Sequence, residues 1–86
     1  MDATEALRVT DAPDDAPTRE LDVRSLGPPK PMTETLETLA ALDDGEVVVQ
    51  FNDRAPEFLY PKLEDRGFAY ETVENDDATV TTIWHA

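Results

Sequence analysis

The sequence predicts an α+β fold, a two-layer α/β sandwich in which two helices cover one face of a mixed four-stranded sheet. The first observation behind this prediction is that apolar patterns of strand and helix period alternate in the order β-α-β-α-β-β between residues 19 and 85. The second is the length of 86 residues, which suits one small domain. The third is that right-handed crossovers place both helices on the same side of such a sheet.

The first 18 residues are predicted to form a disordered, acidic N-terminal tail. They combine alanine, aspartate, proline and threonine with few large apolar side chains, so ordering them would gain little burial. Leu7 and Val9 are compatible with an accessory strand, but Pro13 and Pro17 limit its length. We therefore expect the folded domain to comprise residues 19–86.

The first strand and the first helix follow directly. Residues 19–24 alternate in polarity and place Leu21 and Val23 on one face, as in a half-buried strand. Prolines at positions 29 and 31 suit a turn and the first helical positions. Gly45 is expected to end the helix in the left-handed conformation. The apolar face of the helix is predicted to consist of Met32, Leu36, Leu39 and Ala40.

The second strand, residues 46–51, is apolar and β-branched on both faces at its centre, which is typical of an interior strand. A turn over residues 52–56 leads into the second helix, whose apolar face is expected to use Phe58 or Leu59, with Tyr60 and Leu63. Pro61 conflicts with a helix interior, so this helix must begin late enough to hold Pro61 in its first turn or be kinked there.

Residues 68–74 and 79–85 are rich in threonine and aromatic side chains and predict an antiparallel hairpin around Asn75-Asp76-Asp77. The aromatic residues Phe68, Tyr70 and Trp84 are expected in the core, with an aromatic ligand-binding face as the alternative. If the last strand is an exposed edge, it offers a site for strand addition. We therefore expect a monomer, or a weak dimer through the edge of the C-terminal hairpin.

The segment from Leu21 to Pro31 resembles the TusA/SirA sulfur carriers, whose pattern is Leu-Asp-x-x-Gly-Leu-x-Cys-Pro-x-Pro. Here Pro28 stands in the position of the persulfide-carrying cysteine, and Ser25 replaces the glycine. Residues 52–60, Asn-Asp-Arg-Ala-Pro-Glu-Phe-Leu-Tyr, resemble the motif Asn-Asp-x-x-Pro-x-x-Leu-Tyr of domain-of-unknown-function family 2249. Members of that family often carry His-Asp where this chain has Arg54-Ala55, so no histidine role transfers.

The resemblance covers approximately residues 20–85 and implies a TusA/SirA-like domain that lacks the sulfur-carrier cysteine. It also implies an accessory docking protein of sulfur or redox/respiratory metabolism without persulfide chemistry. In that role, the helix start would contact a partner protein. The apolar docking patch would consist of Leu26, Pro28, Pro29 and Met32, with Met32 as a core residue in the competing interpretation.

Composition excludes several classes of function. The absence of cysteine excludes disulfides, thiolate metal sites and cysteine nucleophiles. Seven basic against twenty acidic residues give a net charge of −13, which disfavours binding to nucleic acid or anionic membranes. The acidic balance is typical of halophilic proteins, in which molar salt screens self-repulsion; an acidic binding face is the alternative. Without a basic leader or a long apolar run, the chain is expected to be soluble and cytoplasmic.

The loops after the first two strands are the predicted binding edge. If these strands are parallel neighbours, both helices begin at this edge, where free amide hydrogens attract anions. Three of the seven basic residues, Arg24, Lys30 and Arg54, lie in these loops. We expect the edge to bind a small anion or a partner protein. The predicted ligand-binding residues are Asp22, Arg24, Pro29, Lys30, Asn52, Asp53 and Arg54.

Less specific interpretations remain open for these charged residues. Arg24 and Arg54 are alternatively expected to form surface ion pairs with nearby carboxylates, worth less than about 1 kcal/mol each. Asp22 and Asp53 suggest a catalytic acid pair, but capping and turn bracing are the commoner roles. The acidic pairs at 43–44 and 76–77 and the lone His85 lack metal-ligand spacing. The sequence therefore predicts a non-enzymatic binding module without a cofactor.

Overall fold

The computed structural model describes all 86 residues, and seven elements follow one another along the chain. They are α1 (Ala3–Arg8), β1 (Thr18–Asp22), α2 (Lys30–Ala40), β2 (Val47–Asn52), α3 (Tyr60–Asp65), β3 (Phe68–Glu74) and β4 (Thr79–His85). From β1 onward this is the predicted order, and both strands of the hairpin begin and end where the sequence places them.

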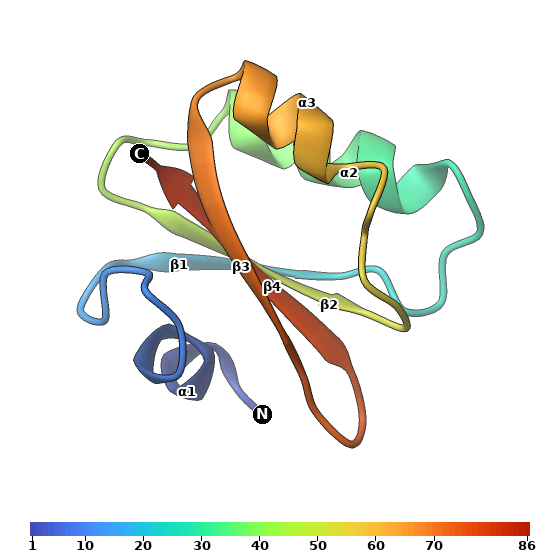
Figure 1. Ribbon diagram of the computed structural model, residues 1–86, viewed down its shortest axis with the longest axis horizontal. Helices are drawn as coiled ribbons and strands as arrows, with labels where there is room; N and C mark the ends of the chain where they lie inside the picture. Colours follow the sequence, from blue (N-terminus) through green and yellow to red (C-terminus); the bar gives the residue numbers. More distant parts are fainter.

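The four strands form one sheet in the spatial order β1-β2-β4-β3. β1 and β2 are parallel, whereas β4 is antiparallel to both β2 and β3. α2 and α3 lie together on one side of this sheet, so the predicted mixed sheet with two helices on one face is confirmed (Figure 1). The expectation of an exposed last strand is wrong, because β4 lies between β2 and β3 and the hairpin's edge strand is β3.

The core between the sheet and the two helices is built from aliphatic side chains. Its buried members are Leu39, Leu42, Val48, Leu59, Leu63 and Ile83, and Phe68 and Tyr70 pack against them. Pro61 stands at the start of α3, which settles the choice between a late start and a kink in favour of the late start. The left-handed glycine is Gly67, with φ of 79°, and not Gly45 as the sequence suggested.

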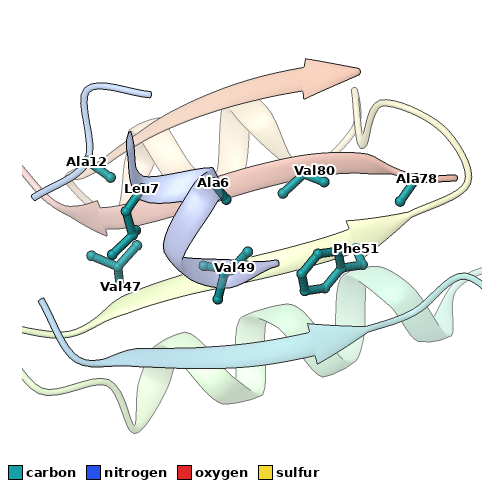
Figure 2. Packing of buried hydrophobic residues seen from close by; sticks show 9 residues of the cluster. Ala6, Leu7, Ala12, Val47, Val49, Phe51, Ala78 and Val80 are labelled. Carbon is teal, nitrogen blue, oxygen red and sulfur yellow. The ribbon is translucent and has the colours of Figure 1, made fainter. Parts of the chain in front are cut away.

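The N-terminal segment differs most from its prediction. Instead of a disordered tail, residues 3–8 form α1, which packs on the sheet face opposite α2 and α3 (Figures 1 and 2). Asp2 caps the helix by accepting a hydrogen bond from the Glu5 amide at 2.8 Å. The segment buries Ala3, Ala6, Leu7 and Ala12 against the sheet.

The apolar face beneath α1 gives the physical reason for this difference. Val47, Val49, Phe51 and Val80 all point to that side, and without a cover they would be exposed to water. Small alanines let the short helix approach the strands closely, so a segment of low hydrophobicity still gains enough burial to order. No helix in the structure is long and apolar enough to cross a bilayer.

Candidate functional site

A pocket of about 340 Å³ lies between the loop that joins β1 to α2 and the loop that joins β2 to α3. This is the edge at which the carboxyl ends of two parallel strands meet, as the sequence predicted. Prolines, aliphatic side chains and one phenylalanine form most of its walls. The first loop contributes Leu26, Pro28, Pro29, Pro31 and Met32, and the second contributes residues 53–59. The four residues of the predicted apolar patch, Leu26, Pro28, Pro29 and Met32, therefore all line this pocket.

Two buried carboxamides from the end of β2 lie at the bottom of this pocket. Gln50 is fully buried and Asn52 is 5% exposed. The Asn52 amide donates to Gln50 Oε1 at 3.3 Å, and the Gln50 amide donates to Thr35 Oγ1 on α2 at 2.8 Å. These bonds make the pocket floor polar while its walls are apolar.

The rim of the pocket carries the most exposed large apolar side chain of the protein. Phe58 is 83% exposed, although its neighbour Leu59 is almost fully buried. Arg54 also lies on the rim, where its Nε donates to Asp53 Oδ1 at 3.2 Å. The Phe58 side chain therefore lies in water at the edge of the pocket, an unfavourable environment for an apolar group.

The helix starts provide fewer amide hydrogens than the predicted anion site requires. Within residues 28–32 the three prolines have no N–H group, and the Lys30 amide already donates to the Gly27 carbonyl at 3.1 Å. α3 has only six residues and holds Pro61 in its first turn. The two helix starts converge as expected, but proline removes most of the donors that would hold an anion.

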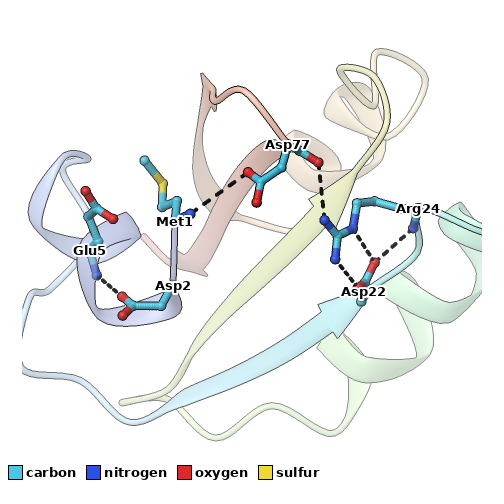
Figure 3. Close-up of polar contacts among 6 residues, drawn as sticks. All are labelled: Met1, Asp2, Glu5, Asp22, Arg24 and Asp77. Atoms are coloured by element: carbon cyan, nitrogen blue, oxygen red, sulfur yellow. Dashed lines mark hydrogen bonds and ion pairs between the residues drawn. The ribbon is translucent and has the colours of Figure 1, made fainter.

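Arg24 and Asp22 lie elsewhere, at a second pocket of about 310 Å³ on the α1 side of the sheet. Arg24 Nη2 lies 2.6 Å from Asp22 Oδ2, and Arg24 Nη1 donates to the Asp77 carbonyl at 3.2 Å (Figure 3). The hydrogen bond from the Arg24 side chain lowers the pKa of Asp22 below its ordinary value and raises the pKa of Arg24. The surface ion pair that the sequence offered as an alternative is present here.

Strand alternation explains why the predicted site divides into two. Asp22 pairs with Phe51 in the β1–β2 register, so both side chains face α1, whereas Asn52 is one residue further and faces α2 and α3. From the sequence alone, all of these loop residues were expected at one edge, without a division between the two faces of the sheet. Four of the seven predicted residues, Pro29, Asn52, Asp53 and Arg54, line the first pocket, which we call the apolar-walled pocket, and Lys30 is adjacent to it in the sequence. Asp22 and Arg24 line the second pocket, which we call the acidic pocket.

Sequence reasoning did not assign Gln50, which lines the pocket, or Thr35, which accepts a hydrogen bond from Gln50 behind it. The signal for Gln50 was available, because it is the only polar side chain within the run Val47–Phe51. A lone amide in a fully buried strand needs hydrogen-bond partners and therefore points to a polar cluster. Thr35 gave no such signal, since threonine is common on the exposed faces of helices.

The remaining polar candidates are separate from the pocket. Asp53 does not cap α3, which begins without a side-chain cap, and instead pairs with Arg54. His85 packs on Phe68, with ring centroids 4.8 Å apart, and its Nε2 lies 3.9 Å from Asp44. No group of three or more histidine, aspartate or glutamate side chains is close enough together to hold a metal ion.

A mixed four-stranded sheet with a pocket at the start of its two covering helices defines a small α+β domain with one open, largely apolar edge. By sequence, the chain belongs to a family of uncharacterised conserved proteins, domain-of-unknown-function family 2249, which matches residues 20–85. The match contains both pocket loops and begins after α1. Searches of curated proteins and of solved structures gave no match.

Proposed function

We propose that the protein is a non-enzymatic binding module that docks a partner protein at the apolar-walled pocket between the β1–α2 and β2–α3 loops. The observation that carries the proposal is the 83% exposure of Phe58 on the rim of this pocket. Covering a phenylalanine that is left in water contributes roughly 1.5–3 kcal/mol to an association. A few side chains that become fully buried on binding carry most of the energy of a protein interface, and large aromatic side chains serve as such anchors.

The charges around the pocket favour an uncharged segment of the partner over a small anion. Asp53 and Glu57 face the rim together with Arg54, and Lys30 lies beside it, so two negative charges stand against two positive ones. Elsewhere the protein is strongly acidic, with a net charge of −13. A neutral rim imposes little repulsion on a protein partner, and it gives little attraction to a free anion.

The small-anion hypothesis loses its main support for the same reasons. Arg24 lies at the other pocket and is neutralised by Asp22, and Arg54 is paired with Asp53. The helix starts offer few free amides. A partner from sulfur or redox/respiratory metabolism, as the resemblance to sulfur carriers implies, belongs to this docking proposal as its narrower form.

Site-specific photo-cross-linking tests the proposal. A benzophenone amino acid replaces Phe58 in one variant and Val9 in a matched control, because Val9 is the other exposed large apolar residue and lies next to α1. We expect a discrete adduct from position 58 in the native host and none from position 9. Mass spectrometry of the adduct identifies the partner.

The adduct must also depend on the pocket. Adding Pro28→Asp, which places a carboxylate on the apolar wall, is expected to abolish the adduct at position 58 without unfolding the protein, since Pro28 is exposed. Equal adducts from positions 58 and 9, or an adduct that persists with Pro28→Asp, would show that the contact is non-specific and would overturn the proposal.

A further inference from the structure

The buried hydrogen-bond chain at the pocket floor has a fixed direction. The Asp53 amide donates to Asn52 Oδ1 at 2.7 Å, which orients the Asn52 carboxamide with its nitrogen toward Gln50. The Gln50 nitrogen in turn donates to Thr35, and the Thr35 hydroxyl donates to the Pro31 carbonyl at 2.7 Å. In every bond of this series, the donor lies on the side of the β2–α3 loop and the acceptor on the side of the first turn of α2.

This direction decides which hydrogen-bonding groups remain available. Each carboxamide nitrogen has two hydrogens, and the series of hydrogen bonds uses one on Asn52 and one on Gln50. Each carboxamide oxygen already accepts one bond. The second hydrogens of Asn52 and Gln50 have no partner in the protein, and both side chains line the pocket. Gln50 is completely enclosed, whereas Asn52 is 5% exposed, so only Asn52 can meet a ligand. Unpaired buried donors cost free energy until a ligand provides an acceptor.

We propose that Asn52, held in place by the fully buried Gln50, forms a carbonyl-recognition site at the floor of the pocket, and that the docked segment places a peptide carbonyl there beside an apolar side chain. This inference rests on the proposed function and names the chemistry of the segment. A neutral carbonyl matches the neutral Asn52 donor. A carboxylate would need a compensating charge, and the nearest arginine, Arg54, is exposed and already paired with Asp53.

An NMR titration with small probes tests the inference without the partner in hand. N,N-dimethylisovaleramide has an isobutyl group and a carbonyl that only accepts hydrogen bonds, so it imitates the proposed segment. Isovalerate has the same hydrocarbon with a carboxylate. The probes are added to ¹⁵N-labelled protein in molar potassium chloride, and the side-chain NH₂ signals of Asn52 and Gln50 are followed. We expect the amide probe to move one proton of the Asn52 NH₂ pair downfield, saturably, while its partner proton stays.

Three other outcomes would overturn the inference. If the amide probe shifts Phe58 and Met32 but leaves both NH₂ groups unchanged, the pocket binds apolar groups without reading a carbonyl, and the docking proposal survives alone. If isovalerate binds more tightly than the amide, the site selects a carboxylate. If the NH₂ signals move with protein concentration alone, the occupant is a second copy of this chain.

An isosteric variant provides the matched control. Asn52→Asp removes both amide hydrogens while keeping the shape, and is expected to weaken binding of the amide probe about tenfold. Asn75→Asp makes the same exchange in the exposed β3–β4 turn and is expected to leave binding unchanged. Equal binding by wild type and Asn52→Asp would contradict a donor role for Asn52. The wild-type titration decides the question if Asn52→Asp does not fold.

Discussion

The two faces of the sheet end in pockets of similar volume but opposite character. On the α1 face, Arg24 is bonded to Asp22 and to the Asp77 carbonyl, so the strongest polar groups of that pocket are satisfied within the chain. On the α2–α3 face, the walls are apolar and two buried amides keep unpaired hydrogens. This difference shows that charged residues alone do not locate a binding site, because side chains that form ion pairs within the protein are not available to a ligand.

The largest expected difference is in the free energy of unfolding, between variants of the two phenylalanines that line these pockets. Phe51 is 9% exposed and packs in the cluster under α1, so Phe51→Ala should lower the free energy of unfolding by about 3–5 kcal/mol. Phe58→Ala should change it by less than about 0.5 kcal/mol, because the side chain is exposed. Denaturant unfolding in molar potassium chloride measures both. Similar losses would mean that Phe58 stabilises the fold rather than serving the surface.

A second pair of variants compares the helices that cover the two faces. Leu63 and Leu7 are both buried, each in a six-residue helix, but on opposite sides of the sheet. Leu63→Ala should cost about 3–5 kcal/mol, whereas Leu7→Ala should stay near the lower limit of about 2 kcal/mol, since a short terminal helix relaxes more easily around a cavity. The same unfolding experiment measures this difference. A larger loss for Leu7→Ala would make α1 the more important cover.

The polar floor should also contribute to stability. Gln50→Leu has a similar volume but leaves Asn52 without its acceptor and Thr35 without its donor, so we expect a loss of about 1–3 kcal/mol. Thr81→Val serves as the control, because Thr81 is a buried polar residue of the same sheet whose hydroxyl bonds to Thr72 and not to Asn52, Gln50 or Thr35. Unchanged stability in Gln50→Leu would show that the floor amides are energetically neutral to the fold.

The smallest effect concerns the acidic pocket and its pH dependence. The bond from Arg24 lowers the pKa of Asp22 in the folded protein, so the pair stabilises the fold above the ordinary value near 3.8. That stabilisation is lost as the pH falls through the lowered pKa. A ¹³C NMR titration of the Asp22 carboxyl should give a midpoint that rises toward 3.8 in Arg24→Met. An identical midpoint in both proteins would show that the pair does not persist in solution.

Much of the fold was predictable because the local composition and the spacing of apolar residues and prolines indicate the individual helices and strands. The strands of the hairpin from Phe68 to His85 are rich in threonine and aromatic side chains, and the prolines at 29 and 31 mark the start of α2. The order of the strands in the sheet required pairing partners far apart in the chain, so β4 was wrongly expected to be an edge. α1 was missed because its alanines gain burial only from a sheet face that no local pattern describes.

The candidate site was predictable in its location and not in its chemistry. The loops after β1 and β2 do form a pocket, since parallel strands bring their carboxyl ends together. The basic side chains were the expected ligand-binding groups, but Arg24 and Arg54 are paired with Asp22 and Asp53. The role of Gln50 depends on tertiary contacts with Thr35 and Asn52, and the exposure of Phe58 depends on how the turn before α3 packs against the core.

The most direct test of the docking proposal compares the two pockets in one experiment. ¹⁵N-labelled protein is placed in lysate of the native host at molar potassium chloride, and the intensity of each backbone signal is recorded. We expect selective broadening of residues 26–32 and 52–59, lost in the Phe58→Ala variant, while Asp22, Arg24 and Asp77 keep their intensity. Broadening of those three residues with sharp signals at the apolar-walled pocket would contradict the proposed site.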